Sequence, residues 1–299
     1  EWELSDTSYR ELFPEANRSL VSHGGAAAGR GMRGATDTTL GRKDVAFQVR
    51  GPLTRTPLAI FGMSVMQDDA HTGSEYRLYA YDTWSKHTPD QFMFIEAGHT
   101  GGALYRALGA VCSTLRVTCP AVDKDRGKCT FEASIMAANS TRQTGYVTGT
   151  PTYDTDVPTL TTDITLAQGA VGSPASTPFS SLWFEIANGL KPGLNAGDYP
   201  EYWILDDLVV RGEFTMMLTS SQSDEWGVAY AAHEAKTMRQ ISIAASSVFD
   251  LSVEALYGPP KTTEVGGGHL VTIPWEGRYQ TSTRPNLGIA FSSAVFNWA

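Results

Sequence analysis

Three glycines near the start of the chain have the spacing of a nucleotide-binding loop. Gly29, Gly31 and Gly34 fit the pattern G-x-G-x-x-G, in which backbone N–H groups at a helix N-terminus bind a pyrophosphate. The pattern has this meaning only between a strand and a helix. Here no apolar strand precedes the glycines and no amphipathic helix follows them, so the sequence predicts a loop that binds no cofactor.

Two pairs of neighbouring carboxylates are the next candidates for chemistry. Asp68 is followed by Asp69, and Asp206 is followed by Asp207. General acid–base catalysis needs two carboxyl groups that face each other across a site. Adjacent residues of a strand point to opposite faces, and we expect a strand over residues 203–219. Both pairs are therefore interpreted as surface charge, and the sequence offers no catalytic residue.

The histidines and cysteines do not form a metal-binding pattern. His99 and His269 stand beside glycines, without a carboxylate or thiol at ligand spacing. Cys112, Cys119 and Cys129 are too few and too widely spaced for a disulfide framework or a zinc site. We expect three plain thiols made in a reducing cytoplasm, and no metal.

The elements that would position any site are predicted to be strands. Hydrophobic residues make up 41% of the 299 residues and charged residues only 18%, with 29 glycines and 15 prolines. Long surface helices usually need more Glu and Lys, so this composition indicates an all-β or β-dominated fold with many turns. The net charge of −9 argues against a basic surface for nucleic acid or an anionic membrane. No apolar run approaches the length of a membrane-spanning helix.

A short repeat divides the chain into two halves. Val49-Arg50-Gly51-Pro52-Leu53-Thr54 is matched by Val210-Arg211-Gly212-Glu213-Phe214-Thr215. A predicted helix follows each copy, over residues 58–66 and 225–236, and three predicted strands follow each helix. These strands span 76–81, 92–95 and 129–137 in the first half, and 239–244, 269–273 and 288–296 in the second. The common order predicts a duplicated β-domain, and a single larger sandwich with chance similarities stays open as the alternative.

The duplication predicts four regions. Residues 1–40 form an N-terminal loop or arm, 41–140 the first β-domain, 141–180 a connector and 181–299 the second β-domain.

One stretch of the second half resembles a known family. Residues 182–190 (LWFEIANGL) run into a loop with Gly197-Asp198-Tyr199-Pro200, and the chain returns over residues 204–218 with the second copy of the repeat. This pattern resembles the tail tube proteins of bacteriophages with long non-contractile tails (siphophages). The resemblance implies duplicated β-sandwich or barrel domains, each flanked by a short helix, in a structural virion protein that is not an enzyme.

The resemblance also implies the partners. Copies would close into rings of three two-domain chains with pseudo-sixfold symmetry, or of six chains, and the rings would stack into the hollow tail tube. The tape measure protein and then viral DNA would pass through the lumen, and tail terminator and distal tail proteins would bind the tube ends. Assembly would take place in the host cytoplasm, with no membrane partner.

Two surfaces of such a tube can be predicted. We expect the loop from Lys191 to Tyr202 to touch the neighbouring ring, with Lys191, Pro192, Leu194, Tyr199 and Tyr202 as its contact residues. We also expect a net negative lumen, because a wall that bound phosphates would hold the DNA through released counterions.

Two other functions are open on the sequence alone. A head or baseplate protein of a virion would share this composition. A carbohydrate-binding β-sandwich would use exposed aromatic side chains, for which Trp84, Trp226 and Trp275 are the candidates.

Overall fold

Most of the chain from Val45 to Ala290 is described in a computed structural model. The described residues are 3–4, 20–22, 38–40, 45–72, 75–81, 87–98, 104–122, 127–143, 156–193, 202–218, 223–245, 248–265, 268–278 and 285–290. They confirm the predicted all-β class, with strands as the dominant element and two α-helices.

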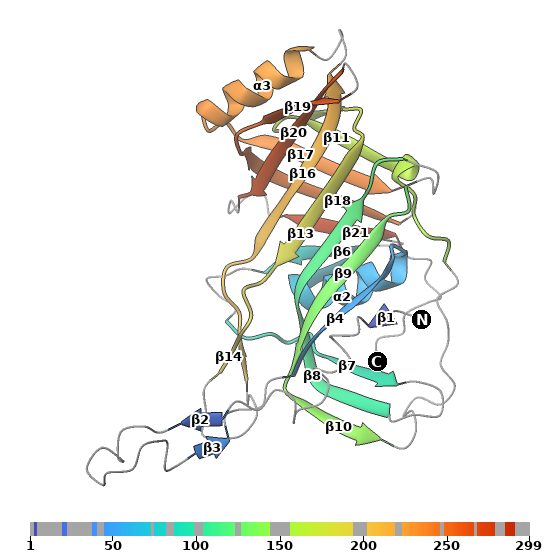
Figure 1. Ribbon diagram of the computed structural model, residues 1–299, viewed down its shortest axis with the longest axis vertical. Coiled ribbons are helices and arrows are strands. Elements are labelled where there is room, and N and C mark those ends of the chain that lie inside the picture. The colour runs from blue at the N-terminus through green and yellow to red at the C-terminus, as the bar shows by residue number, and fades with distance from the viewer. Residues whose placement is uncertain are drawn as a thin grey trace, which may run out of the picture.

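One sheet runs along the molecule and is called the long sheet here (Figure 1). Every neighbouring pair in it is antiparallel. Its strands, in spatial order, are β1 (Glu3–Leu4), β4 (Val45–Pro52), β9 (Thr130–Ala137), β8 (Leu104–Cys119), β13 (Ser181–Ala187), β16 (Val209–Leu218), β20 (Gly268–Gly277) and β19 (Lys261–Val265).

A second layer, the crossing sheet, has strands that run across those of the long sheet (Figure 1). The end of β18 also pairs with β20, from Ala255 to Tyr257, and joins the two layers at one corner. In spatial order the crossing sheet contains β12 (Ser173–Ser176), β11 (Ile164–Ala170), β17 (Arg239–Ala245), β18 (Phe249–Tyr257), β21 (Asn286–Ala290), β6 (Glu75–Ala80) and β5 (Gln67–Thr72).

Smaller elements complete the described structure. The lower part of β8 pairs with β7 (Met93–Gly98) and β10 (Asn139–Gln143). Two short hairpins are formed by β14 (Lys191–Pro192) with β15 (Trp203–Ile204), and by β2 (Leu20–Ser22) with β3 (Thr38–Leu40). A single 3₁₀ turn, η1 (Thr161–Asp163), precedes β11.

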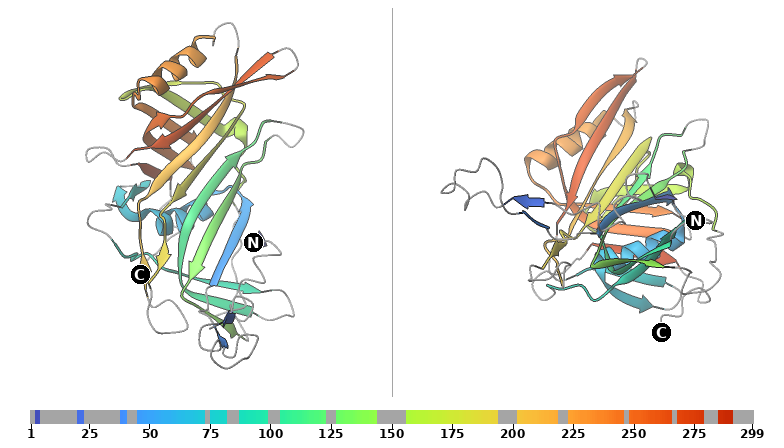
Figure 2. Two further views of the ribbon diagram at one scale, coloured as in Figure 1. Left: turned by 60° about the vertical axis from the view of Figure 1, so that its left-hand side comes forward. Right: turned by 60° about the horizontal axis from the view of Figure 1, so that its bottom comes forward.

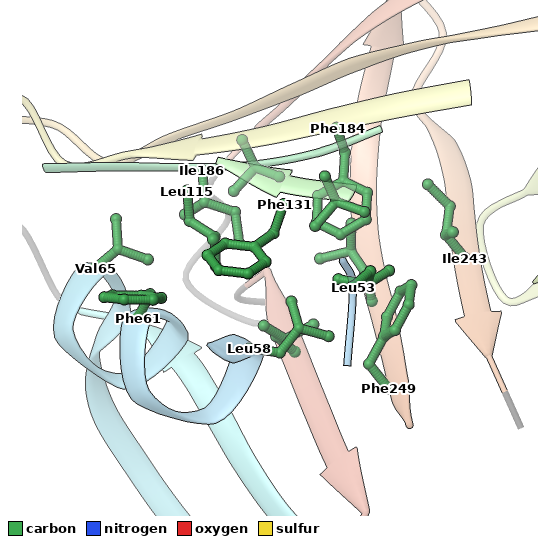
Figure 3. Close-up of a cluster of buried hydrophobic side chains, with 14 of the residues drawn as sticks. Leu53, Leu58, Phe61, Val65, Leu115, Phe131, Phe184, Ile186, Ile243 and Phe249 are labelled. Carbon is green, nitrogen blue, oxygen red and sulfur yellow. The ribbon is translucent and has the colours of Figure 1, made fainter. Parts of the chain in front are cut away.

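The core lies between the two sheets and encloses the helix α2 (Arg55–Met66). Side chains of β9 alternate between buried and exposed, as expected for a strand with one face in a core. Phe61 of α2 stacks on Phe131 of β9 at a centroid distance of 5.7 Å. Figure 3 shows this cluster, in which α2 is covered by side chains of both sheets.

No described helix or strand covers the opposite face of the long sheet, which is called the open face here. In Figure 2 (left) the strands of the long sheet lie toward the viewer, with α2 and the crossing sheet behind them. The sheet therefore has one apolar face and one polar face.

The second helix, α3 (Ser223–Glu234), lies at the far end of the molecule (Figure 1). Of its described side chains only Ala229 and Ala232 are buried. Both predicted helices are thus confirmed, but only α2 is enclosed by the core.

The strand correspondence predicted between the two halves is wrong for the last two strands of each half. The counterpart of β9 is β20, because each pairs with a copy of the repeat in the same register: Glu132 faces Arg50 and Glu276 faces Arg211. Residues 286–290, which the sequence matched to β9, form β21 between β6 and β18.

Two further expectations change in detail. The predicted strand over 203–219 is interrupted at residues 205–208, between β15 and β16. The predicted connector 141–180 contains β11 and β12, and β11 pairs with β17 along its whole length. The boundaries of the two predicted β-domains stay a prediction.

Candidate functional site

The two copies of the repeat lie in β4 and β16 and present the same residues to the same faces. Val49 and Val210 point into the core, and Arg50 and Arg211 lie exposed on the open face. The following glycine faces an aromatic residue of the neighbouring strand, Phe131 opposite Gly51 and Trp275 opposite Gly212. The repeat is therefore a structural unit of the sheet.

Gly212 shows why this position needs a glycine. A Cβ atom there would lie 2.4 Å from the carbonyl oxygen of Trp183 and 2.5 Å from the Trp275 ring. Both distances are far below van der Waals contact, so the missing side chain lets the Trp275 ring approach the strand closely.

The pairing around the repeat reveals a match that the sequence analysis missed. Glu3 and Leu4 of β1 face Arg50 and Val49, just as Glu185 and Ile186 of β13 face Arg211 and Val210. The short sequences EWELS at residues 1–5 and WFEIA at 183–187 share the Glu-aliphatic pair. Each copy of the repeat is thus flanked by two glutamates in register, Glu3 and Glu132 in one copy, and Glu185 and Glu276 in the other.

Arg116 of β8 connects the two copies. It is in register with Glu132 on one side and with Glu185 on the other, and its guanidinium carbon lies 4.3 Å from the centroid of the Trp183 ring. One row of alternating charge therefore crosses the sheet, and we call it the charge row. Its members with described side chains are Arg50, Glu132, Arg116, Glu185, Arg211 and Glu276.

Alternation in the charge row places every charge beside its opposite. Cross-strand pairs of opposite charge stabilise a sheet, and like charges directly opposite each other destabilise it. Arg211 donates to Glu185 through Nε at 2.8 Å and Nη2 at 2.5 Å. The charge row therefore favours one register across the junction of the two halves.

The open face is balanced in charge over its paired strands from β4 to β19. By the alternation of side chains along each strand, four cations and four carboxylates in this region take the same face of the sheet as the charge row. They are Arg50, Arg116, Arg211 and Lys261, and Glu132, Glu185, Glu213 and Glu276. Threonines fill much of the remaining surface, as in the cross-strand pair of Thr215 and Thr272, whose hydroxyl oxygens lie 3.1 Å apart.

Two open hollows lie over equivalent parts of the two copies. The first, of about 720 Å³, is lined by residues that include Arg50, Gly51 and Glu132. The second, of about 520 Å³, is lined by residues that include Arg211, Gly212 and Glu276.

No three His, Cys, Asp or Glu side chains gather as a metal site anywhere in the part of the chain that the structure describes.

The predicted ring-contact loop begins and ends in the hairpin of β14 and β15, whose described residues 191–193 and 202–204 we call the arm. Lys191 faces Ile204 and Pro192 faces Trp203. The Gly193 N–H donates to the Tyr202 carbonyl oxygen at 2.8 Å, and the Tyr202 ring occupies the space that a Cβ on Gly193 would need. Of the predicted contact residues, Leu194 and Tyr199 lie outside the described residues.

The base of the arm is fixed by a small hydrophobic cluster of its own. Trp203, Leu190 and Leu205 are buried there with Tyr81 and Val111. The Trp203 indole Nε1 donates to the Gly109 carbonyl oxygen at 3.1 Å. Tyr202 and Ile204 stay 44% and 40% exposed, so the arm offers apolar surface on a rigid base.

Asp206 and Asp207 lie beside the arm, in the irregular segment and not in the predicted strand. The Asp206 carboxylate accepts a hydrogen bond from Lys191, and this bond lowers the pKa of Asp206. The Tyr81 hydroxyl donates to the carbonyl oxygens of Asn188, at 3.2 Å, and of Asp206. Burial, and then the negative charges of Asp206 and Asp207, raise the pKa of Tyr81.

The remaining candidate residues from the sequence are either part of the core or of a strand, or lie outside the described residues. Cys112, Cys119 and Cys129 are free and buried, and burial raises the pKa of Cys112.

Trp275 is only 3% exposed, which leaves it unavailable as a sugar-stacking platform. Asp68 and Asp69 lie in β5, in register with Tyr79 and Leu78 of β6, and His269 is an exposed residue of β20. The glycine loop at 29–34, His99 and Trp84 lie outside the described residues, as does the side chain of Trp226.

These features define an all-β structural protein whose distinctive surfaces are a sheet face, two sheet ends and a projecting arm. A family model for phage tail tube proteins matches residues 26–278. The chain belongs to this family and is a structural component of the virion tail. No curated protein matches the chain. Neither described helix is long and apolar enough to cross a membrane.

Proposed function

We propose that copies of this chain close into rings that stack into the hollow tail tube, with the open face of the long sheet lining the lumen. The observation that carries the proposal is the composition of the long sheet. Each copy of the repeat lies in a set of four strands, β1-β4-β9-β8 in one half and β13-β16-β20-β19 in the other. One chain thus supplies two equivalent wall segments.

The strand count supports a ring of three chains over a ring of six. Three chains would supply about 24 strands, and strands about 4.8 Å apart with a tilt of about 45° give a backbone diameter near 50 Å. Inward side chains leave a channel of about 40 Å, which admits duplex DNA. A six-chain ring of the same sheets would be about twice as wide. Closure would also remove the exposed sheet edges that otherwise invite aggregation.

The charge of the open face suits a conduit. A cationic wall would bind DNA through counterion release, whereas here each arginine of the charge row stands beside a glutamate. The net negative lumen expected from the sequence would not come from these strands, because their described charges balance. From β4 to β19 the wall we propose is neutral in its described charges and rich in threonine.

The arm is the proposed contact between stacked rings. Lys191, Pro192 and Tyr202 are its described members of the predicted set, and its exposed apolar side chains stand on a fixed base. In this arrangement the tape measure protein and then viral DNA pass through the lumen into the host. Tail terminator and distal tail proteins cap the ends, and assembly takes place in the host cytoplasm.

Electron microscopy of the purified protein tests the proposal. We expect rings with threefold symmetry at low concentration, and open-ended tubes with a channel of about 40 Å at high concentration. Shells or discs of fixed height would support a head or baseplate role instead. Binding on a glycan array by a protein that stays monomeric would support the carbohydrate-binding alternative.

A further inference from the structure

Two of the three cysteines meet across the pairing of β8 with β9. The register between these strands ends at Thr118 opposite Thr130, and the next pair along the two antiparallel chains is Cys119 and Cys129. Both cysteine side chains are fully buried in the core between the sheets. Cys112 lies seven residues earlier in β8, roughly 20 Å away along the strand. Within one chain, Cys119 and Cys129 can therefore pair only with each other.

The backbone of Cys129 shows which kind of cross-strand pair this is. Its carbonyl oxygen accepts a hydrogen bond from the Leu53 N–H at 2.9 Å, and its own N–H donates to the Thr159 carbonyl oxygen at 3.0 Å. Both backbone groups thus point away from β8, so Cys119 and Cys129 form a non-hydrogen-bonded pair. In such pairs the Cα atoms are about 4.5 Å apart and the side chains are closest. That separation lies within the range of about 4.4–6.8 Å that a disulfide spans.

The two thiols are in hydrogen-bond contact and are not equivalent. The bond from the Cys119 thiol lowers the pKa of Cys129, against the opposing effect of burial, and the same bond and burial raise the pKa of Cys119. The Thr161 hydroxyl, whose Oγ1 lies 3.7 Å from the Cys129 Sγ, also favours the Cys129 thiolate. Cys129 is therefore the better nucleophile of the pair, and Cys119 is placed to resolve what forms on it.

The ends of the segment that connects β8 to β9 are already held together beside this pair. The Thr161 Oγ1 lies 2.7 Å from the Pro120 carbonyl oxygen and 2.9 Å from that of Gly127. Pro120 follows Cys119 directly, and Gly127 precedes Cys129 by two residues. A covalent bond between the two sulfurs would close the same segment at its base without moving the strands.

We propose that Cys119 and Cys129 are a redox pair that forms an intrachain disulfide in the released virion, with a peroxide as the oxidant. The chain is a component of the virion tail, and a virion persists outside the cell, where disulfides form and endure. The plain thiols expected from the sequence are then the state of the newly made protein. This inference does not depend on the ring or on its symmetry.

The chemistry takes two steps and balances with hydrogen peroxide. The Cys129 thiolate attacks one peroxide oxygen, the O–O bond breaks, and the departing hydroxide takes up the proton that the thiol released. The Cys119 sulfur then attacks the sulfenic acid on Cys129, the S–S bond forms, and the S–O bond breaks with loss of water. Two thiols and one hydrogen peroxide thus give one disulfide and two waters. Local opening of the structure admits an oxidant of this size.

Thiol counting tests the pair. Reduced protein that is unfolded in guanidinium chloride should show all three thiols with Ellman's reagent. Folded protein that is first treated with hydrogen peroxide should show one, and peptide mass spectrometry without reduction should recover Cys119 linked to Cys129, with Cys112 alkylated. Three remaining thiols, or a sulfinic acid on Cys129 beside a free Cys119, would overturn the proposal.

Single variants and a second oxidant provide the controls. Cys112→Ala should still lose two thiols, whereas Cys119→Ala and Cys129→Ala should give no linked peptide. Refolding in a glutathione buffer rich in the disulfide form brings the pair to equilibrium without entry of an oxidant into the folded core. We expect the linked form there as well, and a pair that stays reduced in this buffer also contradicts the proposal.

The bond should also be visible in thermal unfolding. It closes a loop of eleven residues, from Cys119 to Cys129, and so restricts the unfolded chain. We expect the oxidised protein to unfold about 5 °C above the reduced one, and dithiothreitol to reverse the shift. Cys112→Ala should keep this dependence on reductant, and Cys119→Ala should lose it. A midpoint that ignores reductant in every variant would show that the pair does not stabilise the virion protein, whether or not the chain forms tubes.

Discussion

The Arg211 guanidinium donates two hydrogen bonds, from Nε and Nη2, to a single carboxylate oxygen of Glu185 on the adjacent strand. The two side chains differ in exposure, 57% for Arg211 and 11% for Glu185. The pair thus holds a mostly buried carboxylate at the point where the second half of the chain joins the first.

Removal of this arginine should destabilise the protein. In Arg211→Ala the Glu185 carboxylate loses its donors while it stays largely shielded from water, which we expect to cost about 1–3 kcal/mol of unfolding free energy. Chemical denaturation measures the change. In the double variant Arg211→Ala, Glu185→Gln the buried charge is absent and part of the loss should return. Equal stabilities of wild type and Arg211→Ala would contradict this account.

Gly212→Ala should destabilise the protein by overpacking. The added methyl group would meet the Trp183 carbonyl and the Trp275 ring, and forced shifts of this kind cost about 1–3 kcal/mol. Gly227→Ala is the matched control, because a Cβ atom there meets nothing within 4 Å. Gly227 lies inside α3, so this change should stabilise the helix by up to about 1 kcal/mol. Thermal unfolding should separate the two variants in opposite directions.

Tyr81 should make stability fall in alkaline solution. Its pKa is raised in the folded protein by burial and by the nearby Asp206 and Asp207 charges. The neutral phenol is therefore favoured by folding, and its contribution is complete below the ordinary tyrosine pKa near 10 and is lost as the pH rises above it.

Tyr81→Phe tests this dependence. The variant should be less stable at pH 7 by about 1 kcal/mol, because two carbonyl oxygens lose a donor, but should lose less additional stability above pH 10. The buried thiol of Cys112, whose pKa is also raised, should keep part of the alkaline loss in both proteins. Identical slopes of stability against pH would refute the role of Tyr81.

Deletion of residues 191–198 should uncouple ring formation from stacking. The deletion removes Lys191 and Pro192 of the arm and leaves the long sheet intact. We expect folded protein that forms isolated rings but no tubes in electron micrographs. Tubes of normal length would show that the arm makes no necessary contact between rings.

A lysine on the open face should turn the tube wall into a DNA-binding surface. Thr130 is exposed on β9 beside the charge row, and Thr130→Lys would repeat one added cation in every copy along the tube. We expect tubes of this variant to retain duplex DNA at low salt and to release it steeply as salt rises. Thr165→Lys, at an exposed position of β11 in the crossing sheet, should bind much less DNA inside the tube.

Part of the structure could be predicted from the sequence because the signal is local. The composition predicted the all-β class, and the match around Arg50 and Arg211 predicted two related strands. A short apolar run predicted the first helix, and helical spacing predicted the second. The resemblance to tail tube proteins depended on residues 182–218, which lie close together in the chain and form the adjacent strands β13 and β16.

The charge row could not be predicted in the same way. Nothing in the local sequence around Glu132 and Glu276 shows that they face Arg50 and Arg211. The predicted correspondence of residues 129–137 with 288–296 was wrong for the same reason. A strand's period of two fixes which face a side chain takes, but not which strand will lie beside it.

The sequence by itself determined that this chain builds β-structure from two related halves and carries no recognisable catalytic or metal-binding pattern. Only the tertiary structure decided that Glu132, Arg116 and Glu276 belong to one row and that α2 is enclosed while α3 is left at an end. The physical reason is that sheet neighbours are selected by packing of the shared core and by long-range register, so residues more than a hundred positions apart become adjacent without any mark in their local sequence.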